Sequence, residues 1–419
     1  MLPPVLIRKK ELTPYEDIVD PHLIGRIQDL AETLKGIRVL EINSTSSGGG
    51  VAELLGSTVP LMNALGVTTD WQIVTRDSRF FEITKSFHNA LQGMNNSIST
   101  KDMDIYLEHN HHFAEKLEGD YDFIIVNDPQ PAAMLHFATH RRSRWIWRCH
   151  IDTSDPNPAV WSFLQPYIQD YDAAIFTMPG FVPPRLRLKR IEFIPPAIDP
   201  LSPKNWPLPK ALCKQTLIGL GIDPCRPLIS QVARFDPWKD PMGVISVYRE
   251  VKKSIPGLQL ALIGSMARDD PEAWHIYNQI AKEAHSDDDL FMFTNLDGVG
   301  NLEVNVLQRS SQVIIQKSIR EGFGLAVSEG LWKNIAVVGG DTGGIPLQMA
   351  NGVGGFLVEN DQDCVSRVKY LLQNEEEARE MAMHGHDRIR EHFLIPRYLA
   401  DTLRLLKSML YEELSDVVA

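Results

Sequence analysis

Residues 320–329 read REGFGLAVSE, so that Glu321 and Glu329 stand with seven residues between them. Just before them, the run VIIQ at 313–316 is short, apolar and β-branched, which is typical of a buried strand. Two glycines then open a predicted helix and allow a ligand to approach the backbone closely. A helix that begins after a strand directs N–H groups and the positive end of its dipole at one place, where anions bind. The segment predicts either an anion site or, in the plainer interpretation, a tight turn with two solvated glutamates.

Short apolar strands alternate with helical segments through both halves of the chain. In the first half, strands are expected near 37–42, 71–75, 123–126, 145–147, 173–177 and 191–194. In the second half, they are expected near 227–232, 258–264, 290–294, 313–316 and 335–338. Such alternation predicts an α/β protein with parallel sheets covered on both faces. Prolines interrupt the pattern over 195–209, as is typical of a linker, and the end of the chain, about 362–412, is predicted to be helical.

The composition excludes several classes of protein. The 419 residues leave room for two or three domains, and the net charge of −12 argues against nucleic acid or anionic membranes as a main partner. The four cysteines form no CxxC pair, so neither a disulfide framework nor a zinc site is indicated. There is no signal-peptide pattern and no apolar run of the roughly 20 residues that a membrane helix needs. We expect a cytoplasmic protein whose oligomeric state stays open, with a homodimer as one alternative.

The REGFGLAVSE segment resembles the Glu-X7-Glu signature of the retaining glycosyltransferases with the GT-B architecture. QVARFDPWK at 231–239 resembles the Arg…Lys pair with which that family grips a nucleotide diphosphate. Four first-half segments resemble one subgroup, the trehalose glycosyltransferring synthases of family GT4: NSTSSGGGVAE at 43–53, FHNALQG at 87–93, DPQP at 128–131 and WRCHID at 147–152. The likeness runs from about residue 36 to the C-terminus.

The resemblance implies a fold of two Rossmann-like lobes whose parallel sheets face a central cleft. It places an acceptor-binding lobe at 1–205 and a nucleotide-sugar-binding lobe at 206–392. It also implies that a final helix, within 393–419, crosses back to the first lobe.

The same resemblance implies three groups of site residues. The catalytic group comprises Glu321, Arg234, Lys239 and His150. The donor-binding group comprises Gly49, Gly50, Asn295, Leu296, Gly322, Phe323, Gly324, Leu325 and Glu329. The acceptor-binding group comprises Asn43, His88, Gln92, Asp128 and Asp152.

The residue types suit these implied roles. The fork of Arg234 and the point charge of Lys239 would neutralise a diphosphate leaving group. Glu329, a pure acceptor with two oxygens, would bind both ribose hydroxyls, while Glu321 would lie beside the transferred sugar. His150 would reach the 6-hydroxyl of that sugar. For Asp128, a cap at the end of a strand is an equally good interpretation.

No metal or other cofactor is expected. The acidic runs DMD at 102–104 and DDD at 287–289 look like metal motifs, but helix starts and solvated turns account for them. The histidines near residue 110 have no carboxylate at metal-binding spacing. The family generally uses protein cations and helix dipoles in place of a metal.

The implied reaction transfers glucose from UDP-, ADP- or GDP-glucose to the anomeric hydroxyl of glucose and gives α,α-trehalose with retention. The partners are then a nucleoside-diphosphate glucose and glucose or trehalose, and the physiological direction stays open. The alternatives are a trehalose phosphorylase, in which phosphate replaces the nucleotide, and a related GT4 transferase with another sugar acceptor. The complete set of catalytic candidates argues against a non-catalytic nucleotide-sugar sensor.

Overall fold

The computed structural model describes residues 1–74, 77–139, 142–266 and 271–418. Within these residues, none of the helices combines the length and the apolar character needed to cross a membrane. All four cysteines, which lie in the described part, are free thiols.

The chain folds into two compact units, which are described separately. Unit 1 comprises Met1–Ala197 and Ile395–Ala419, and unit 2 comprises Ile198–Leu394. The boundary lies earlier than the sequence suggested, because residues 198–205 pack with unit 2 and were expected in the first lobe. This segment makes side-chain contacts with helices of unit 2 that sequence patterns do not reveal.

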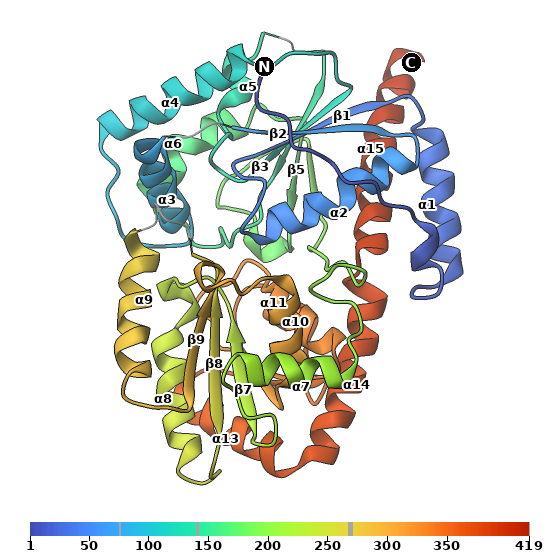
Figure 1. The fold of residues 1–419 in the computed structure, drawn as a ribbon. Coiled ribbons are helices and arrows are strands. Elements are labelled where there is room, and N and C mark those ends of the chain that lie inside the picture. Colours follow the sequence, from blue (N-terminus) through green and yellow to red (C-terminus); the bar gives the residue numbers. More distant parts are fainter. Residues whose placement is uncertain (75–76, 140–141, 267–270, 419) are drawn as a thin grey trace. The chain divides into compact units, whose positions relative to one another are not determined.

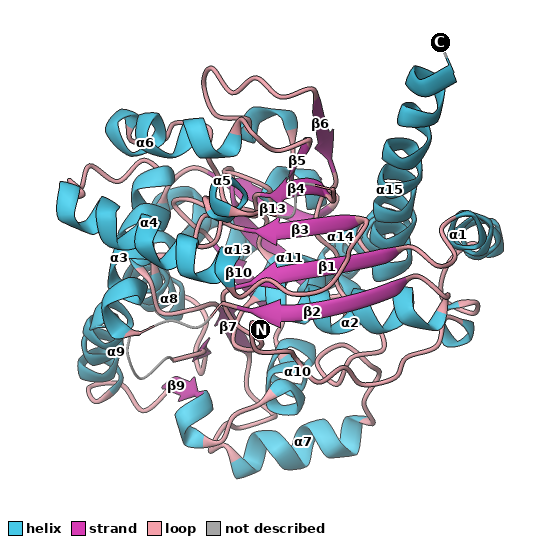
Figure 2. Cartoon of the chain, turned by 90° about the horizontal axis from the view of Figure 1, so that it is seen from above, coloured by secondary structure: helices cyan, strands magenta, loops and turns pink. Residues whose placement is uncertain are grey.

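Unit 1 is built on a six-stranded sheet in the order β2-β1-β3-β4-β5-β6, with parallel neighbours throughout (Figure 2). The strands are β1 Arg38–Asn43, β2 Thr68–Ile73, β3 Phe123–Asn127, β4 Arg144–Arg148, β5 Ala173–Phe176 and β6 Arg190–Phe193. The helices are α1 Pro21–Thr33, α2 Gly50–Ala64, α3 Ser78–Leu91, α4 Thr100–Glu115, α5 Met134–Phe137, α6 Pro158–Ile168 and α15 Ile395–Val418. Every residue of β3 is buried, as expected for a central strand that helices cover on both faces.

Unit 2 is built on a seven-stranded parallel sheet in the order β12-β13-β11-β10-β7-β8-β9, of which Figure 1 shows β7, β8 and β9 side by side. The strands are β7 Leu228–Val232, β8 Gln259–Gly264, β9 Leu290–Thr294, β10 Val313–Gln316, β11 Ala336–Gly340, β12 Ala350–Asn351 and β13 Gly354–Val358. The helices are α7 Lys210–Gly219, α8 Pro241–Lys252, α9 Pro271–Ala284, α10 Asn301–Ser310, α11 Leu325–Trp332, α12 Ile345–Gln348, α13 Asp361–Gln373 and α14 Glu375–His392. The sequence patterns missed β12 and β13, which are short and glycine-rich.

The helical C-terminal segment consists of three helices, α13, α14 and α15. Pro396 lies at the start of α15, where its missing N–H costs nothing, whereas it would break a continuous helix. The last helix packs against α1 and α2 of unit 1, and Figures 1 and 2 both show it beside α1. The predicted return of the final helix to the first lobe is therefore confirmed.

Candidate functional site

The turn between β10 and α11 is held by close backbone packing. Gly324 caps α11 with a φ of 83°, a left-handed conformation that favours glycine. Gly343 approaches the same turn so closely that a Cβ there would lie 1.7 Å from the Glu321 carbonyl oxygen. Gly344 N–H donates to that oxygen at 3.3 Å. The turn that carries Glu321 is thus fixed by glycines about twenty residues further along the chain.

Lys239 and Glu321 are brought together by neighbouring strands. Lys239 ends the short 3-10 helix Pro237–Lys239 after β7, and Glu321 follows β10, which pairs with β7. Lys239 Nζ lies 2.7 Å from both carboxylate oxygens of Glu321, and Ser318 Oγ donates to Oε2 at 2.9 Å. Glu321 is only 5% exposed. The structure therefore places a cation and a carboxylate of the predicted catalytic group in direct contact beside the start of α11.

Arg234 occupies the same loop as Lys239 but is much more exposed. Its Nη2 lies 3.1 Å from Asp236 Oδ2, and its side chain is 51% exposed. Asp236 in turn accepts from Trp238 N–H at 2.9 Å and shapes the loop. The guanidinium group is therefore positioned by its own loop and remains accessible.

Glu329 is buried in α11 within a ring of polar partners. It is 1% exposed, Gln308 Nε2 donates to its Oε2 at 2.8 Å, and Lys204 Nζ lies 2.8 Å from its Oε1. Burial by itself would raise the pKa of the Glu329 carboxyl, but the charges of Lys204 and Lys333 outweigh it and hold that pKa below its usual value. The carboxylate is therefore ionised at neutral pH. Sequence reasoning missed Lys204 because nothing in the proline-rich linker marks it.

Two other residues of the predicted donor-binding group make structural contacts within unit 2. Asn295, after β9, accepts from Met266 N–H at 2.6 Å and donates to Met266 O at 3.1 Å, so its side chain ties two loops together. Phe323 is buried against Phe393, with ring centroids 5.4 Å apart. Gly322 and Leu325 flank the α11 turn, and Leu296 is exposed beside Asn295.

The glycine loop of unit 1 leads directly into a helix. Gly49 is the N-cap of α2 in an extended conformation, and Gly50 is the first residue of that helix. A Cβ on Gly49 would meet no atom within 4 Å, so the fold does not require glycine there. Asn43, at the end of β1, donates from Nδ2 to Thr45 O at 2.9 Å and braces the start of the loop.

His150 and Asp128 lie together at the ends of neighbouring strands. His150 N–H donates to Asp128 Oδ1 at 2.9 Å, so Asp128 does cap the next strand, which was the alternative interpretation. Asp128 has a φ of 64°, which is uncommon for a residue other than glycine and concentrates at functional sites. Burial, and then the charge of Arg148, hold the pKa of His150 well below its usual value, so the ring is neutral.

The remaining acceptor candidates lie in or at the end of α3 and in the segment that follows β4 of unit 1. Asp152 is buried and accepts from Ser154 N–H at 3.0 Å. His88 lies half-buried in α3, and Gln92 is the buried C-cap of that helix. A common role of these three residues with His150 stays a prediction.

The acidic runs have structural partners. Ser99, rather than Asp102, is the N-cap of α4, and Asp102 accepts from the Ser99 hydroxyl at 2.8 Å. Asp287 and Asp289 pair with Lys252 at 2.8 and 2.9 Å, so they are ion-paired rather than simply solvated. No group of three candidate metal ligands is found among the residues that the structure describes.

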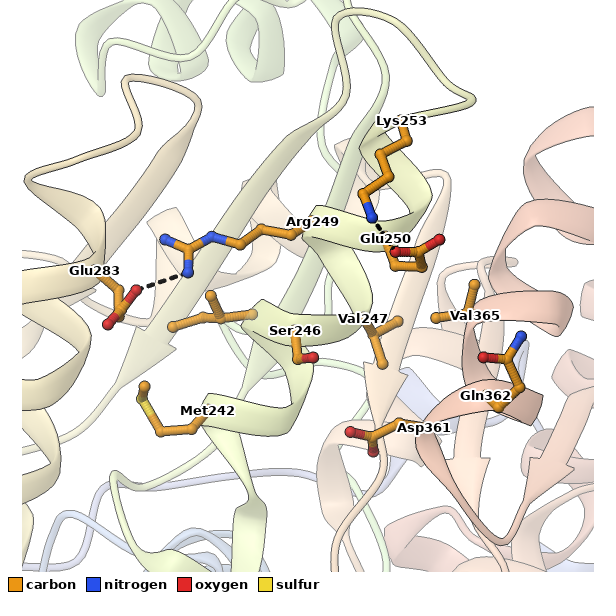
Figure 3. Close-up of a pocket in the computed structure, with 11 residues that line it drawn as sticks. Met242, Ser246, Val247, Arg249, Glu250, Lys253, Glu283, Asp361, Gln362 and Val365 are labelled. Carbon is orange, nitrogen blue, oxygen red and sulfur yellow. Dashed lines mark hydrogen bonds and ion pairs between the residues drawn. The ribbon is translucent and has the colours of Figure 1, made fainter.

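A cavity of about 470 Å³ lies elsewhere in unit 2 (Figure 3). It is lined by α8, α9 and α13, and its charged residues pair locally, Arg249 with Glu283 at 2.7 Å and Lys253 with Glu250. None of the predicted site residues lines it, and its mixture of paired charges offers no distinct ligand chemistry. We therefore do not assign it to the candidate site.

Comparisons with known proteins identify the family of this chain. Residues 41–183 match the family model of the trehalose synthase N-terminal domain, and residues 219–388 match that of the group 1 glycosyl transferases. A trehalose synthase from Rubrobacter xylanophilus is 47% identical over 406 residues, which cover 96% of this chain and 97% of the relative. A trehalose phosphorylase from Pleurotus pulmonarius is only 28% identical and is matched over 56% of its length and 87% of this chain.

Solved structures support the same fold. A UDP-forming α,α-trehalose-phosphate synthase from Burkholderia xenovorans superposes with a TM-score of 0.69 at 16% identity, covering 88% of this chain and 98% of that one. At that identity the likeness shows the fold alone, which is the predicted GT-B fold of two Rossmann-like units. The two matched domains and the close full-length relative show that the chain belongs to the trehalose synthase family of glycosyltransferases.

Proposed function

We propose that this protein transfers glucose from a nucleoside-diphosphate glucose to the anomeric hydroxyl of glucose, giving α,α-trehalose with retention of configuration. The observation that carries the proposal is Lys239 Nζ held against Glu321 beside the start of α11, with the ionised Glu329 on the same helix. A diphosphate would take up the charge of Lys239 together with the N–H groups that begin α11. Glu329 would accept from the ribose hydroxyls.

The surroundings of the two glutamates support a route without a covalent glycosyl-enzyme. Both oxygens of Glu321 contact Lys239, and Glu329 is buried beneath Gln308 and Lys204. A retaining glycosidase uses one of two carboxyl groups as its nucleophile, whereas here each glutamate is engaged by a lysine. In the proposed reaction the departing diphosphate, stabilised by Lys239 and Arg234, accepts the proton of the attacking hydroxyl on the same face of the sugar.

Diphosphate and Glu321 would compete for the same ammonium group. When Lys239 turns to phosphate oxygens, Glu321 loses its strongest partner and can accept from hydroxyls of the transferred sugar. One cation would thereby couple leaving-group binding to sugar binding, and its contact with the developing charge strengthens in the transition state. We propose that this protein cation replaces a metal, and that no other cofactor is needed.

The test is a product assay with glucose and each of UDP-, ADP- and GDP-glucose, with the product identified by chromatography and by the anomeric coupling in its NMR spectrum. Nucleotide-dependent formation of α,α-trehalose is the expected result, and UDP-glucose is the first donor to test because the Burkholderia synthase is UDP-forming. A second arm supplies trehalose and inorganic phosphate. Release of glucose 1-phosphate there, with no nucleotide-dependent product, would establish the phosphorylase alternative; a product with another sugar would establish a different acceptor.

A further inference from the structure

A chain of buried polar side chains leads to His150 across three neighbouring strands of unit 1. Glu41 lies in β1, Asn127 ends β3 and His150 follows β4, and these strands are adjacent in the sheet. Glu41 is 5% exposed and Asn127 2%. Burying polar groups at that depth costs free energy unless they are hydrogen-bonded, so the hydrogen-bond partners of these two side chains fix how they are oriented. The signal in the sequence was a single charge inside the apolar run VLEI.

The hydrogen bonds determine which way the Asn127 amide faces. Its Nδ2 lies 2.8 Å from Glu41 Oε2 and 3.2 Å from the backbone oxygen of Ile42. A backbone carbonyl can only accept, so the NH2 group must be on that side. The Oδ1 atom is then the one that faces His150 Nε2, at 2.9 Å. A flipped amide would place Oδ1 against the carbonyl oxygen of Ile42, which can only accept, and would forfeit that bond.

This orientation decides where the proton sits on the His150 ring. Oδ1 can only accept, so Nε2 must carry hydrogen. Burial, followed by the charge of Arg148, holds the pKa of His150 well below its usual value, so the ring carries one hydrogen and not two. Nδ1 is therefore an acceptor. The backbone of the same residue is held by Asp128, so both the position and the tautomer of the ring are determined by buried neighbours.

We propose that Asn127 and Glu41 are positioning residues that hold His150 as the Nε2–H tautomer, so that its Nδ1 accepts a hydrogen bond from a hydroxyl of the bound sugar. The identity of that sugar rests on the proposed function, whereas the tautomer does not. Asn127 acts directly on the ring, and Glu41 acts through Asn127.

The protonation of Glu41 does not weaken this arrangement. Burial raises the pKa of Glu41 to about 8, opposed by its hydrogen bond from Asn127 and by the charge of Arg148. A neutral carboxyl still offers an acceptor oxygen to Asn127 Nδ2. A glutamine at position 41 offers one too, so Glu41→Gln is the conservative variant and should preserve the tautomer.

The test is ¹⁵N NMR of histidine-labelled protein at pH 8, in which bare and protonated ring nitrogens have well-separated chemical shifts. The signals of His150 are identified by their loss in His150→Gln. Wild type and Glu41→Gln, in which Asn127 keeps an acceptor for its NH2 group, should show protonated Nε2 and bare Nδ1. Asn127→Leu should show a mixture of both tautomers and a kcat about fivefold lower, which corresponds to the loss of one hydrogen bond worth about 1 kcal/mol.

The outcomes separate this proposal from the proposed function. Nδ1–H at His150 in the wild type overturns the proposal, even if no variant of Asn127 or Glu41 folds. An unchanged tautomer in folded Asn127→Leu overturns the positioning role of Asn127. If the protein shows no nucleotide-dependent trehalose synthesis, the proposed function fails, while the tautomer result still confirms or refutes the role of Asn127 and Glu41 at the ring.

Discussion

Lys204→Met should destabilise unit 2 because it leaves the buried carboxylate of Glu329 short of a positive partner. Lys204 Nζ lies 2.8 Å from Glu329 Oε1, and both residues belong to unit 2. Removing one partner of a buried pair typically costs about 3–5 kcal/mol, far more than the pair contributes to stability. Lys333 remains near the same carboxylate, so we expect the lower end, about 3 kcal/mol.

The assay is differential scanning calorimetry of the full chain at neutral pH. For a cooperative unit of this size, 1 kcal/mol shifts Tm by roughly 2–4 °C, so the transition of unit 2 should fall by roughly 6–12 °C. The matched control is Lys253→Met, the same substitution in an exposed pair with Glu250, which should leave Tm unchanged.

Two further measurements test the role of the Lys204–Glu329 pair: the dependence of Tm on pH, and the effect of Lys204→Met in a Glu329→Gln background. The pKa of Glu329 is depressed in the folded protein, so its contribution to stability is present above its ordinary pKa and is lost as the pH falls. The Tm gap between wild type and Lys204→Met should therefore be largest at neutral pH and narrow towards pH 4. It should also shrink when both proteins carry Glu329→Gln. A decrease in Tm no larger than that of Lys253→Met would show that Lys204 does not stabilise the buried carboxylate. So would a decrease in Tm that is unchanged in the Glu329→Gln background.

Four further expectations follow from the site. Arg234→Ala and Lys239→Ala should each raise the barrier to transfer by about 3 kcal/mol or more in steady-state kinetics. Only Lys239→Ala should also lower Tm, because it leaves the buried carboxylate of Glu321 without its positive partner. Turnover close to that of the wild type in either variant would contradict the role of these residues in binding the diphosphate. Activity should survive dialysis against a chelator, and a loss that magnesium or manganese restores would show that a metal is needed after all. Gly49→Val should fold normally, because a Cβ there meets no atom within 4 Å, and should damage sugar transfer while leaving nucleotide diphosphate affinity nearly intact in calorimetric titration. An equal loss of transfer and of nucleotide affinity would show that the loop also holds the nucleotide. Because burial raises the pKa of Glu41 from 4.5 to about 8, the folded state holds a proton that the unfolded state releases, so the free energy of unfolding should fall between about pH 5 and 8. Denaturation of Glu41→Gln should show a smaller slope over that range, and an equal slope would place the titration elsewhere.

Some of the site could be predicted from short segments because their signals are local. The strand before residue 317, the glycines after it and the helix that follows are encoded within about twenty residues, since alternation, turn chemistry and helix starts depend on neighbours in the chain. The same holds for the Arg234–Lys239 loop, where Asp236 caps the turn two residues away from Arg234. The family resemblance depended on such segments too.

The sequence did not reveal which residues pair with the charged side chains of the site. Lys239 meets Glu321 across 82 residues of sequence, and Asn127 meets Glu41 across 86. Each contact exists only because parallel strands carry distant segments to the same edge of a sheet, an arrangement that depends on the packing of the whole unit.

The sequence by itself determined that the chain forms two series of alternating strands and helices, and approximately where most of them lie. Only the tertiary structure decided the electrostatic state of the site: that Glu329 is an ionised, buried carboxylate beside Lys204, and that the ring of His150 is neutral and bonded to Asn127. The physical reason is that protonation and tautomer depend on burial and on the nearest charges and hydrogen-bond partners, all of which are set by distance in space. Local backbone conformation depends on residues that are close in the chain, whereas the protonation state of a side chain depends on residues that are close in space.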